Sequence, residues 1–275
     1  MLLSLSTACL FPRSWPTIFR LAAECGMDGI ELVVDHQLWL GGAARARSLA
    51  AEHGLEILSI HQTYMPLSPS GGGTDVIIDA AKAALALDVP RVVIHGPFCN
   101  AWRERTAQSW LRSFDRVQTL LAGSGIRVGL ENVGVYTDWD EQNVLAQTSV
   151  LDSFARRHEI GITLDVCHLS LNESPLAAYE LMKDLLVNIH FSDQQGVREE
   201  KNRFGRALST HHRMPGEGQL SLKPFVSRLL ADGYDGPLTF EVSPSSLNVW
   251  SLERARARLD QAVAWIRACQ EDASA

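Results

Sequence analysis

Short runs of apolar residues recur along the whole chain, and amphipathic stretches with a helical period separate one run from the next. A strand inside a parallel sheet is covered on both faces, so it needs a nearly continuous run of Val, Ile and Leu. The intervening stretches, such as 14–26, have the apolar spacing and the Pro and Gly positions of a helix. The sequence therefore predicts strands at 2–8, 28–34, 55–61, 90–96, 126–132, 160–166, 186–191 and 237–242.

Eight strands that alternate with about eight helices predict a single-domain (β/α)8 TIM barrel over residues 1–275. The length of 275 residues and the 46% of hydrophobic residues suit one large barrel, and no low-complexity linker divides the chain. The rival fold is a doubly wound open sheet, which would gather its ligands at a single switch point rather than around a ring. The connection 192–220 is long and polar, and we expect it to cover the mouth of the pocket.

Six of the apolar runs end on a metal-binding or acid–base residue, and this is the strongest functional signal in the sequence. In a barrel of this type the C-terminal ends of the strands form the active site, so these side chains should converge on one pocket. The residues at or just after these ends are His61, His95, Glu131, Asp165, His168, His190, Asp193 and Glu241.

Three carboxylates and one imidazole from the fifth to the eighth predicted strand form the core of this set. Such ligands suit a divalent metal ion, namely Mn²⁺, Mg²⁺, Co²⁺ or Zn²⁺. The alternative is that each residue is a hydrogen-bonded polar group at a strand end, but burying several carboxylates together without a cation is costly. The predicted metal ligands are Glu131, Asp165, His190 and Glu241.

The other histidines leave more than one interpretation open. His61 and His95 could ligate a second ion, hydrogen-bond a substrate or stack against the pocket wall. His211 and His212 precede a Pro-Gly-Glu-Gly turn, and the long connection could bring them over the site. For this pair, metal ligation, substrate contact and solvent exposure are equally open.

Two residues next to the predicted ligands carry separate expectations. Asp193 lies three residues after His190. Its carboxylate could support a metal ligand by accepting a hydrogen bond from it. Cys167 lies between Asp165 and His168, and on a strand its side chain should point away from theirs.

Charge and composition argue against several classes of protein. The net charge is −7, whereas phosphate backbones favour clustered Lys and Arg, so we expect a small-molecule substrate and no nucleic-acid partner. The five cysteines are scattered and form no C-x-x-C pair, which argues against a disulfide framework and favours a cytoplasmic protein. No apolar stretch approaches the roughly 20 residues that span a membrane. The first residues read as a strand rather than as a signal peptide.

Four segments together resemble the xylose isomerase-like TIM barrel superfamily. This superfamily includes sugar epimerases of the D-tagatose 3-epimerase type, inosose dehydratases and isomerases, and endonuclease IV. The segments are LENVG around Glu131, LDVCHLSLNE around Asp165 and His168, HFSD at His190, and HHRMPGEG at 211–218. The resemblance runs from the first strand to Glu241, and members of its epimerase branch often form homo-oligomers.

In the epimerase branch, the counterparts of the four predicted ligands hold one metal ion, and two glutamates exchange a proton α to the substrate carbonyl. The resemblance therefore implies that Glu131 and Glu241 are catalytic in a sugar isomerase or epimerase that works through a metal-stabilised enediolate. It also implies that His168 contacts the substrate. The loop arginine of this branch would fall at His212, with Arg213 beside it.

In the endonuclease IV branch, three zinc ions use further counterparts of His61, His95, His168 and an Asp-x-His before the Gly-Glu-Gly. His212 stands at the position of the loop histidine, but Thr210 stands where the aspartate is expected. The leading prediction is thus a divalent-metal isomerase or epimerase for a sugar, a polyol derivative or a related hydroxy-carbonyl compound. The alternatives are a zinc-dependent phosphodiester hydrolase, a lyase or dehydratase with the same proton chemistry, and a catalytically silent binding protein.

Overall fold

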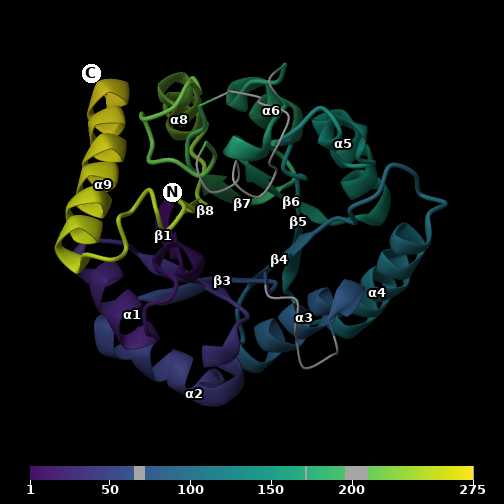
Figure 1. The fold of residues 1–275 in the computed structure, drawn as a ribbon, viewed down its shortest axis with the longest axis horizontal. Helices are drawn as coiled ribbons and strands as arrows, with labels where there is room; N and C mark the ends of the chain where they lie inside the picture. Colours follow the sequence, from purple (N-terminus) through teal and green to yellow (C-terminus); the bar gives the residue numbers. More distant parts are fainter. Residues whose placement is uncertain (65–71, 171, 196–209, 275) are drawn as a thin grey trace.

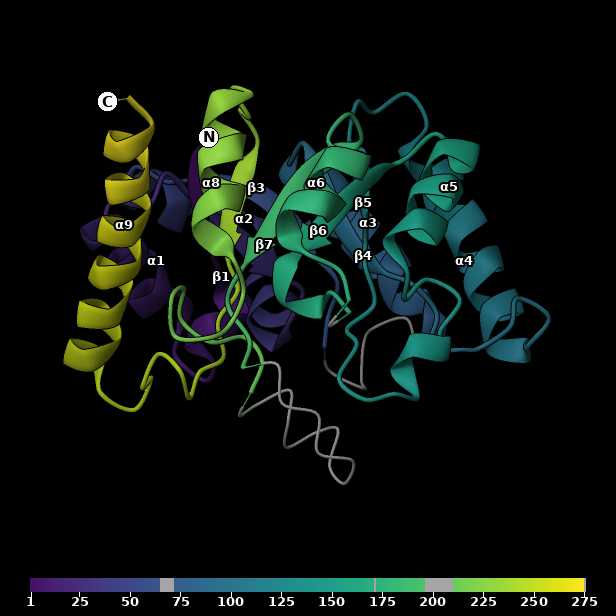
Figure 2. The ribbon, with the colours of Figure 1, turned by 90° about the horizontal axis from the view of Figure 1, so that it is seen from above.

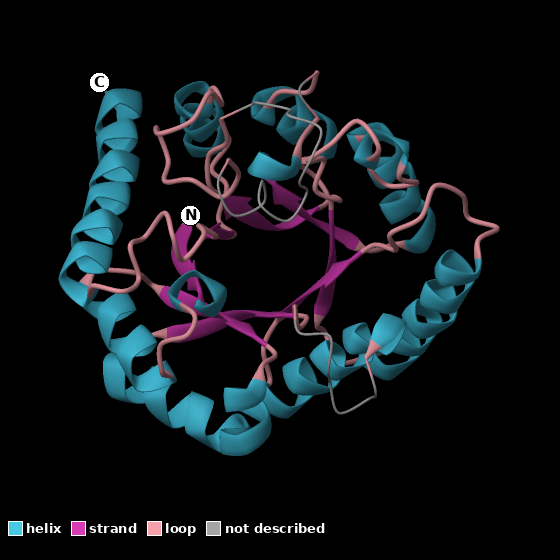
Figure 3. Cartoon of the chain, viewed as in Figure 1, coloured by secondary structure: helices cyan, strands magenta, loops and turns pink. Residues whose placement is uncertain are grey.

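Eight parallel strands close into a barrel in the order in which they follow one another along the chain (Figure 1; Figure 3). The computed structural model describes residues 1–64, 72–170, 172–195 and 210–274. The strands are β1 (Leu2–Ser6), β2 (Gly29–Val33), β3 (Glu56–His61), β4 (Arg91–His95), β5 (Arg127–Glu131), β6 (Gly161–Asp165), β7 (Leu186–Phe191) and β8 (Pro237–Phe240). The predicted strands and the (β/α)8 barrel are confirmed, and the open doubly wound sheet is wrong.

Helices surround the barrel on the outside (Figure 1). Those in the described residues are α1 (Trp15–Glu24), α2 (His36–His53), α3 (Val76–Leu87), α4 (Arg105–Leu121), α5 (Thr148–His158), α6 (Pro175–Met182), α8 (Leu222–Ala231) and α9 (Leu252–Ser274). The N-terminus and the C-terminus of the chain lie at the same end of the barrel (Figure 2). No helix in the described residues is both long and apolar enough to cross a membrane.

Local signals fix where α2 begins and ends. The carboxylate of Asp35 accepts hydrogen bonds from the backbone N–H groups of Gln37 (2.9 Å) and Leu38 (3.1 Å), which would otherwise lack partners. Gly54 follows the helix with φ of 65°, a left-handed conformation that glycine adopts without a steric penalty. Asp35 and Gly54 therefore mark the start and the end of α2, and the chain then continues into β3.

The apolar core lies between the outer surface of the barrel and the helices. Phe191, the last residue of β7, packs against Phe225 of α8 and Trp265 of α9, with ring centroids 6.5 Å and 5.8 Å apart. Phe240 of β8 meets Phe191 at 6.0 Å from the same side of the sheet. These contacts hold the ends of β7 and β8, which carry two of the predicted ligands.

The inside of the barrel carries a polar layer where such barrels usually have Val, Ile and Leu. Its members are fully buried and are Glu31, Ser59, Thr163, Asn188 and Thr239. Side chains two residues apart lie on the same face of a strand, so the next inward-facing residues sit directly above this layer. On four of these strands they are His61, Asp165, His190 and Glu241.

Candidate metal and substrate site

Glu131, Asp165, His190 and Glu241, hereafter the four-residue group, converge at the C-terminal end of the barrel. They lie at the ends of β5, β6 and β7 and directly after β8, and each is buried. One potential ligand atom from each lies within 4.8 Å of the others. His190 Nδ1 is 2.8 Å from Glu241 Oε2, 3.5 Å from Glu131 Oε2 and 4.0 Å from Asp165 Oδ2.

Three atoms of the four-residue group fit a cation because none of them makes a hydrogen bond to the described residues. Asp165 Oδ2, His190 Nδ1 and Glu241 Oε2 are buried and have no hydrogen-bond partner among the described residues. Buried polar atoms of this kind are uncommon in native proteins and need an explanation. A divalent ion would bind oxygen and imidazole nitrogen at this position, so the residues present fit the predicted metal.

The electrostatics of the four-residue group favour positive charge at its centre. Burial raises the pKa of Asp165. Burial acts in the same direction on Glu131 and Glu241, but the histidines around them hold the pKa of both carboxyls well below its ordinary value. Burial lowers the pKa of His190, yet Glu31 and the other carboxylates outweigh it and raise this pKa well above its usual range. Without an ion, protons on histidines therefore balance the carboxylates.

His61 and His95 lie beside Glu131 and form a second group that could hold an ion. Their Nε2 atoms are 3.0 Å apart, and each is 3.2 Å from Glu131 Oε2. His61 Nδ1 lies 2.7 Å from the carbonyl oxygen of Gln62 and can donate its proton there, which turns Nε2 toward Glu131. These three residues are within ligand distance of one another.

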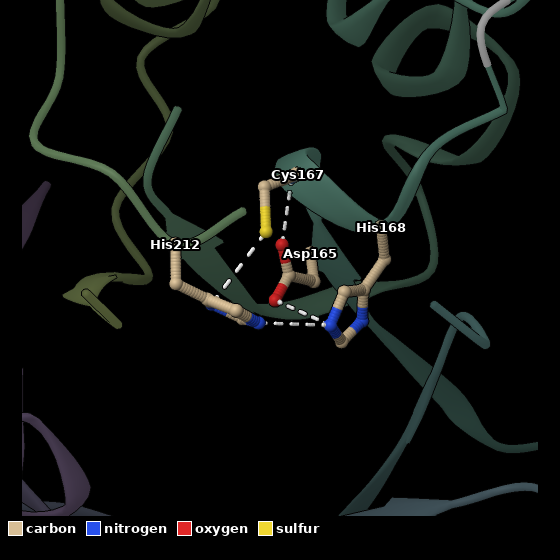
Figure 4. A group of neighbouring side chains, drawn as sticks. All are labelled: Asp165, Cys167, His168 and His212. Atoms are coloured by element: carbon tan, nitrogen blue, oxygen red, sulfur yellow. Dashed lines mark hydrogen bonds and ion pairs between the residues drawn. The ribbon is translucent and has the colours of Figure 1, made fainter. Parts of the chain in front are cut away.

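A third group joins Asp165 to His168, His212 and Cys167 (Figure 4). The Nε2 atoms of His168 and His212 are 3.2 Å apart, and Asp165 Oδ2 is 3.5 Å from His168 Nε2. Cys167 Sγ lies 3.5 Å from His212 Nδ1, so the expectation that Cys167 points away from the site is wrong. The reason is local: the strand ends at Asp165, and Val166–His168 form a 3-10 turn in which alternation no longer applies. Burial raises the pKa of this thiol well above its ordinary value.

The adjacent histidine of the loop lies elsewhere. His211 is buried, packs edge-on against Tyr136 at 4.7 Å between centroids, and has Nδ1 3.0 Å from Thr210 Oγ1. Among the described residues it belongs to none of the groups that could hold a metal. His212 adopts a left-handed conformation (φ 49°), and this turn directs the two neighbouring side chains to different places.

Asp193 holds the loop that carries His212. Its carboxylate accepts hydrogen bonds from the backbone N–H groups of Gly216 (3.0 Å), Gly218 (2.9 Å) and Leu220 (3.1 Å). A Cβ on Gly218 would lie 2.2 Å from Asp193 Oδ1, so only glycine fits there. The carboxylate thus points to the loop backbone and not to His190. The prediction that the connection 192–220 covers the mouth of the pocket depends on residues 196–209, which lie outside the described residues.

Glu31, Tyr64 and Tyr136 are site residues that the sequence reasoning missed. Glu31 Oε2 is 3.1 Å from His190 Nε2. The hydroxyl of Tyr64 donates a hydrogen bond to Glu241 Oε1, and its ring stacks on His61 at 4.7 Å between centroids. Tyr136 Oη is 2.8 Å from His168 Nε2. Glu31 could have been found from strand alternation, which places it inside the barrel. The tyrosines lie in connections after strands and give no such signal.

A cavity of about 240 Å³ opens above the four-residue group. Its lining combines metal-binding and aromatic side chains with a glycine-containing segment. The main lining residues are Tyr64, His95, Phe98, Glu131, Tyr136, His168, His212 and Glu241. Larger hollows occur around Arg127 at the opposite end of the barrel, but they contain none of these residues. The smaller cavity is therefore the candidate substrate pocket.

Comparisons with known proteins agree with the barrel fold. The family model of the xylose isomerase-like TIM barrel matches residues 19–269. An uncharacterized protein of Mycobacterium tuberculosis (strain ATCC 25618 / H37Rv) is 25% identical over 263 residues, covering 88% of this chain and 89% of that protein. The 3-dehydroshikimate dehydratase of Pseudomonas aeruginosa is 26% identical over 255 residues, covering 82% of this chain but 36% of the dehydratase.

Solved structures share the fold at lower sequence identity. The crystal structure of a D-tagatose 3-epimerase-like protein superposes with a TM-score of 0.70 and 19% identity, covering 98% of this chain and 99% of that one. At this identity the likeness concerns the fold alone. It agrees with the barrel read from the sequence.

Proposed function

Because this chain belongs to the xylose isomerase-like TIM barrel family, we propose that it is a divalent-metal-dependent isomerase or epimerase. Its substrate would be a sugar or a related hydroxy-carbonyl compound. The observation that carries the proposal is the four-residue group, in which three buried atoms that have no hydrogen-bond partner in the described part of the chain face one another. The D-tagatose 3-epimerase-like neighbour supports the substrate class.

In this proposal Glu131 and Glu241 are metal ligands and also the acid–base pair. A divalent ion bound by the four-residue group would polarise a substrate carbonyl and lower the cost of removing the neighbouring proton. Each glutamate has one oxygen near His190 Nδ1 and another directed elsewhere: Glu131 Oε1 lies 3.1 Å from His168 Nδ1, and Glu241 Oε1 accepts from Tyr64. One carboxylate would take the proton from one face of the substrate, and the other would return it to the opposite face.

The cavity gives the substrate polar contacts on two sides. His168, with Tyr136 behind it, would hydrogen-bond a hydroxyl group on one side, and Tyr64 would do so on the other. Phe98 is 45% exposed and lines the same cavity, so it would cover an apolar face of a sugar ring. These contacts would position the carbon that loses the proton between the two glutamates.

Two alternatives use the same side chains. A lyase would remove the same proton and then expel a hydroxyl group, and the dehydratase relative supports this variant. A zinc-dependent phosphodiester hydrolase is favoured by a different observation, namely the two further groups around His61–His95–Glu131 and His168–His212–Asp165. Such an enzyme would bind two or three zinc ions, whereas the isomerase needs one ion.

Proton exchange with the solvent tests the proposal directly. The Mn²⁺-loaded protein is incubated with D-fructose, D-tagatose and D-allulose in D₂O, and deuterium at the carbon next to the carbonyl is followed by NMR. We expect exchange in at least one sugar, and a loss of about 100- to 10,000-fold in Glu241→Gln at equal bound metal. Full turnover by this variant with bound metal would contradict the acid–base role.

Metal content separates the alternatives. Mass spectrometry of the purified protein should find one equivalent of Mn, Mg, Co or Zn for the isomerase and two or three of zinc for the hydrolase. Cleavage of a DNA duplex with an abasic site would establish the hydrolase instead. Dehydration of 3-dehydroshikimate without sugar exchange would establish the lyase.

A further inference from the structure

Glu31 is a fully buried carboxylate in the polar layer beneath the four-residue group. It lies in the middle of β2, and its Oε2 atom accepts three hydrogen bonds. The donors are Ser59 Oγ at 2.9 Å, Asn188 Nδ2 at 2.9 Å and His190 Nε2 at 3.1 Å. Asn188 is itself held by Thr239, whose hydroxyl donates to Asn188 Oδ1 at 2.9 Å. The carboxylate is therefore held by donors on β3 and β7, and β8 supports the Asn188 side chain.

The bond to His190 decides which ring nitrogen faces the carboxylates above. A proton on Nε2 is donated to Glu31, so the lone pair of a neutral ring lies on Nδ1. Nδ1 is the atom that lies 2.8 Å from Glu241 Oε2 and that makes no hydrogen bond to any residue the structure describes. A ring with the opposite tautomer would present an N–H group to the metal position and could not bind an ion there.

We infer that Glu31 is a positioning residue: it fixes the tautomer and orientation of His190 and thereby sets the affinity of the four-residue group for a divalent cation. The inference rests on the proposed metal site. Glu31 would be a fifth residue of the metal site, one layer deeper in the barrel than the ligands. Carboxylates that hold metal-binding histidines in this way affect metal affinity strongly.

The chemistry of the polar layer supports a role of this kind. A carboxylate inside a barrel is costly to bury, and Leu or Val would fill the same space without that cost. The three donors converge on Oε2, while Oε1 of Glu31 has no hydrogen-bond partner among the described residues. Hydrogen bonds alone thus leave part of the burial cost uncompensated. A divalent ion on the far side of the His190 ring would offset the charge.

Cobalt binding to the metal-free protein tests the inference without any substrate. Co²⁺ affinity is measured by calorimetry, and its visible spectrum reports the ligand geometry. In Glu31→Gln, the amide can donate to Nε2 and shift the ring proton to Nδ1, so we expect affinity to fall by about 10- to 100-fold with an altered spectrum. Thr163→Val is the matched control, because Thr163 is equally buried in the same layer and contacts neither His190 nor Glu31 in the hydrogen bonds described. We expect wild-type Co²⁺ affinity in this control.

The inference is overturned if Glu31→Gln binds Co²⁺ as tightly as the wild type and with the same spectrum. If that variant does not fold, Ser59→Ala removes one of the three bonds that hold Glu31 and should weaken Co²⁺ binding by a smaller factor. Unchanged affinity in Ser59→Ala would then overturn it. A wild-type protein that binds Co²⁺ but exchanges no substrate proton would contradict the proposed function and leave the role of Glu31 standing.

Discussion

The four-residue group and the histidines around it differ in how their polar atoms are satisfied. In the four-residue group, Asp165 Oδ2, His190 Nδ1 and Glu241 Oε2 have no hydrogen-bond partner in the described part of the chain. The surrounding histidines, hereafter the outer histidines (His61, His95, His168 and His212), contact one another and two tyrosines. Three of them also contact Glu131 or Asp165.

This difference indicates that the two regions need a cation to different degrees. In the four-residue group three buried carboxylates surround one imidazole, and without an ion protons on buried histidines must balance them, which is costly. The outer histidines can satisfy one another by sharing protons, so they are stable without further ions. One ion in the four-residue group is therefore the simplest occupancy, and it favours isomerase chemistry over a hydrolase with several zinc ions.

The largest effect is expected from Asp165→Asn. This change keeps the acceptor for the backbone N–H of Cys167 but replaces Oδ2, which faces His190 Nδ1, by an amide nitrogen. Mn²⁺ affinity, measured by calorimetry, should fall by more than about 100-fold. A loss of about 100-fold is the most that changing a residue behind a metal ligand usually causes. Proton exchange should fall with it.

The stability of the same variant provides the control. Burial raises the pKa of Asp165, which means that its charged form is unfavourable in the metal-free protein. Metal-free Asp165→Asn should therefore unfold at the same temperature as the wild type or higher, as followed by circular dichroism. Wild-type metal affinity in a folded Asp165→Asn would show that the four-residue group is not the metal site.

An intermediate effect is expected from pH on the metal-free protein. Burial lowers the pKa of His168, but Asp165 and Glu131 outweigh it and raise this pKa from 6.5 to about 9. A group with a raised pKa stabilises the fold fully below its unfolded value and loses this contribution as pH rises through the folded value. The titration of His168 alone should thus lower the free energy of unfolding by on the order of 3 kcal/mol between pH 6.5 and above 9.

Urea unfolding in the presence of a chelator measures this loss. His168→Gln should remove its own part of the pH dependence, since its titrating proton is gone, whereas His190, whose pKa is also raised, keeps its contribution. An unchanged dependence in that variant would show that the outer histidines do not carry the balancing proton, and the distinction between the two regions would lose its electrostatic basis.

The strands and the four-residue group could be predicted from the sequence because both follow from local rules. A buried parallel strand needs an apolar run, and a barrel places the ends of such runs around one pocket. Glu131, Asp165, His190 and Glu241 all stand at those ends, so a search of the strand ends finds them. Their convergence then follows from the topology.

A search of the strand ends does not find the remaining contacts. Glu31 lies inside an apolar run rather than at its end, so a search of strand ends passes over it. Cys167 turns toward His212 because a 3-10 turn replaces the strand after Asp165. His211 and His212 diverge because of one left-handed residue. The positions of Cys167, His211 and His212 are consequences of loop conformation, which long-range packing decides.

The smallest effect is expected from His95→Ala, and it tests the outer histidines most directly. His95 has a partly exposed side chain, and its Nε2 atom contacts His61 and Glu131. If the outer histidines hold no ion, Glu131 keeps His168 and His190 as partners. Mn²⁺ affinity and proton exchange should then fall by less than about ten-fold, an effect of about 1.4 kcal/mol or less.

Metal counting makes the result of His95→Ala decisive. The wild type and the variant should both contain one equivalent of metal by mass spectrometry after purification. His61→Ala is the matched variant, because His61 belongs to the same group beside Glu131. If His95→Ala and His61→Ala each lost the same equivalent of zinc, the outer histidines would be metal ligands after all. The two regions would then form one multinuclear metal centre. This result would favour phosphodiester hydrolysis over proton transfer as the reaction of the protein.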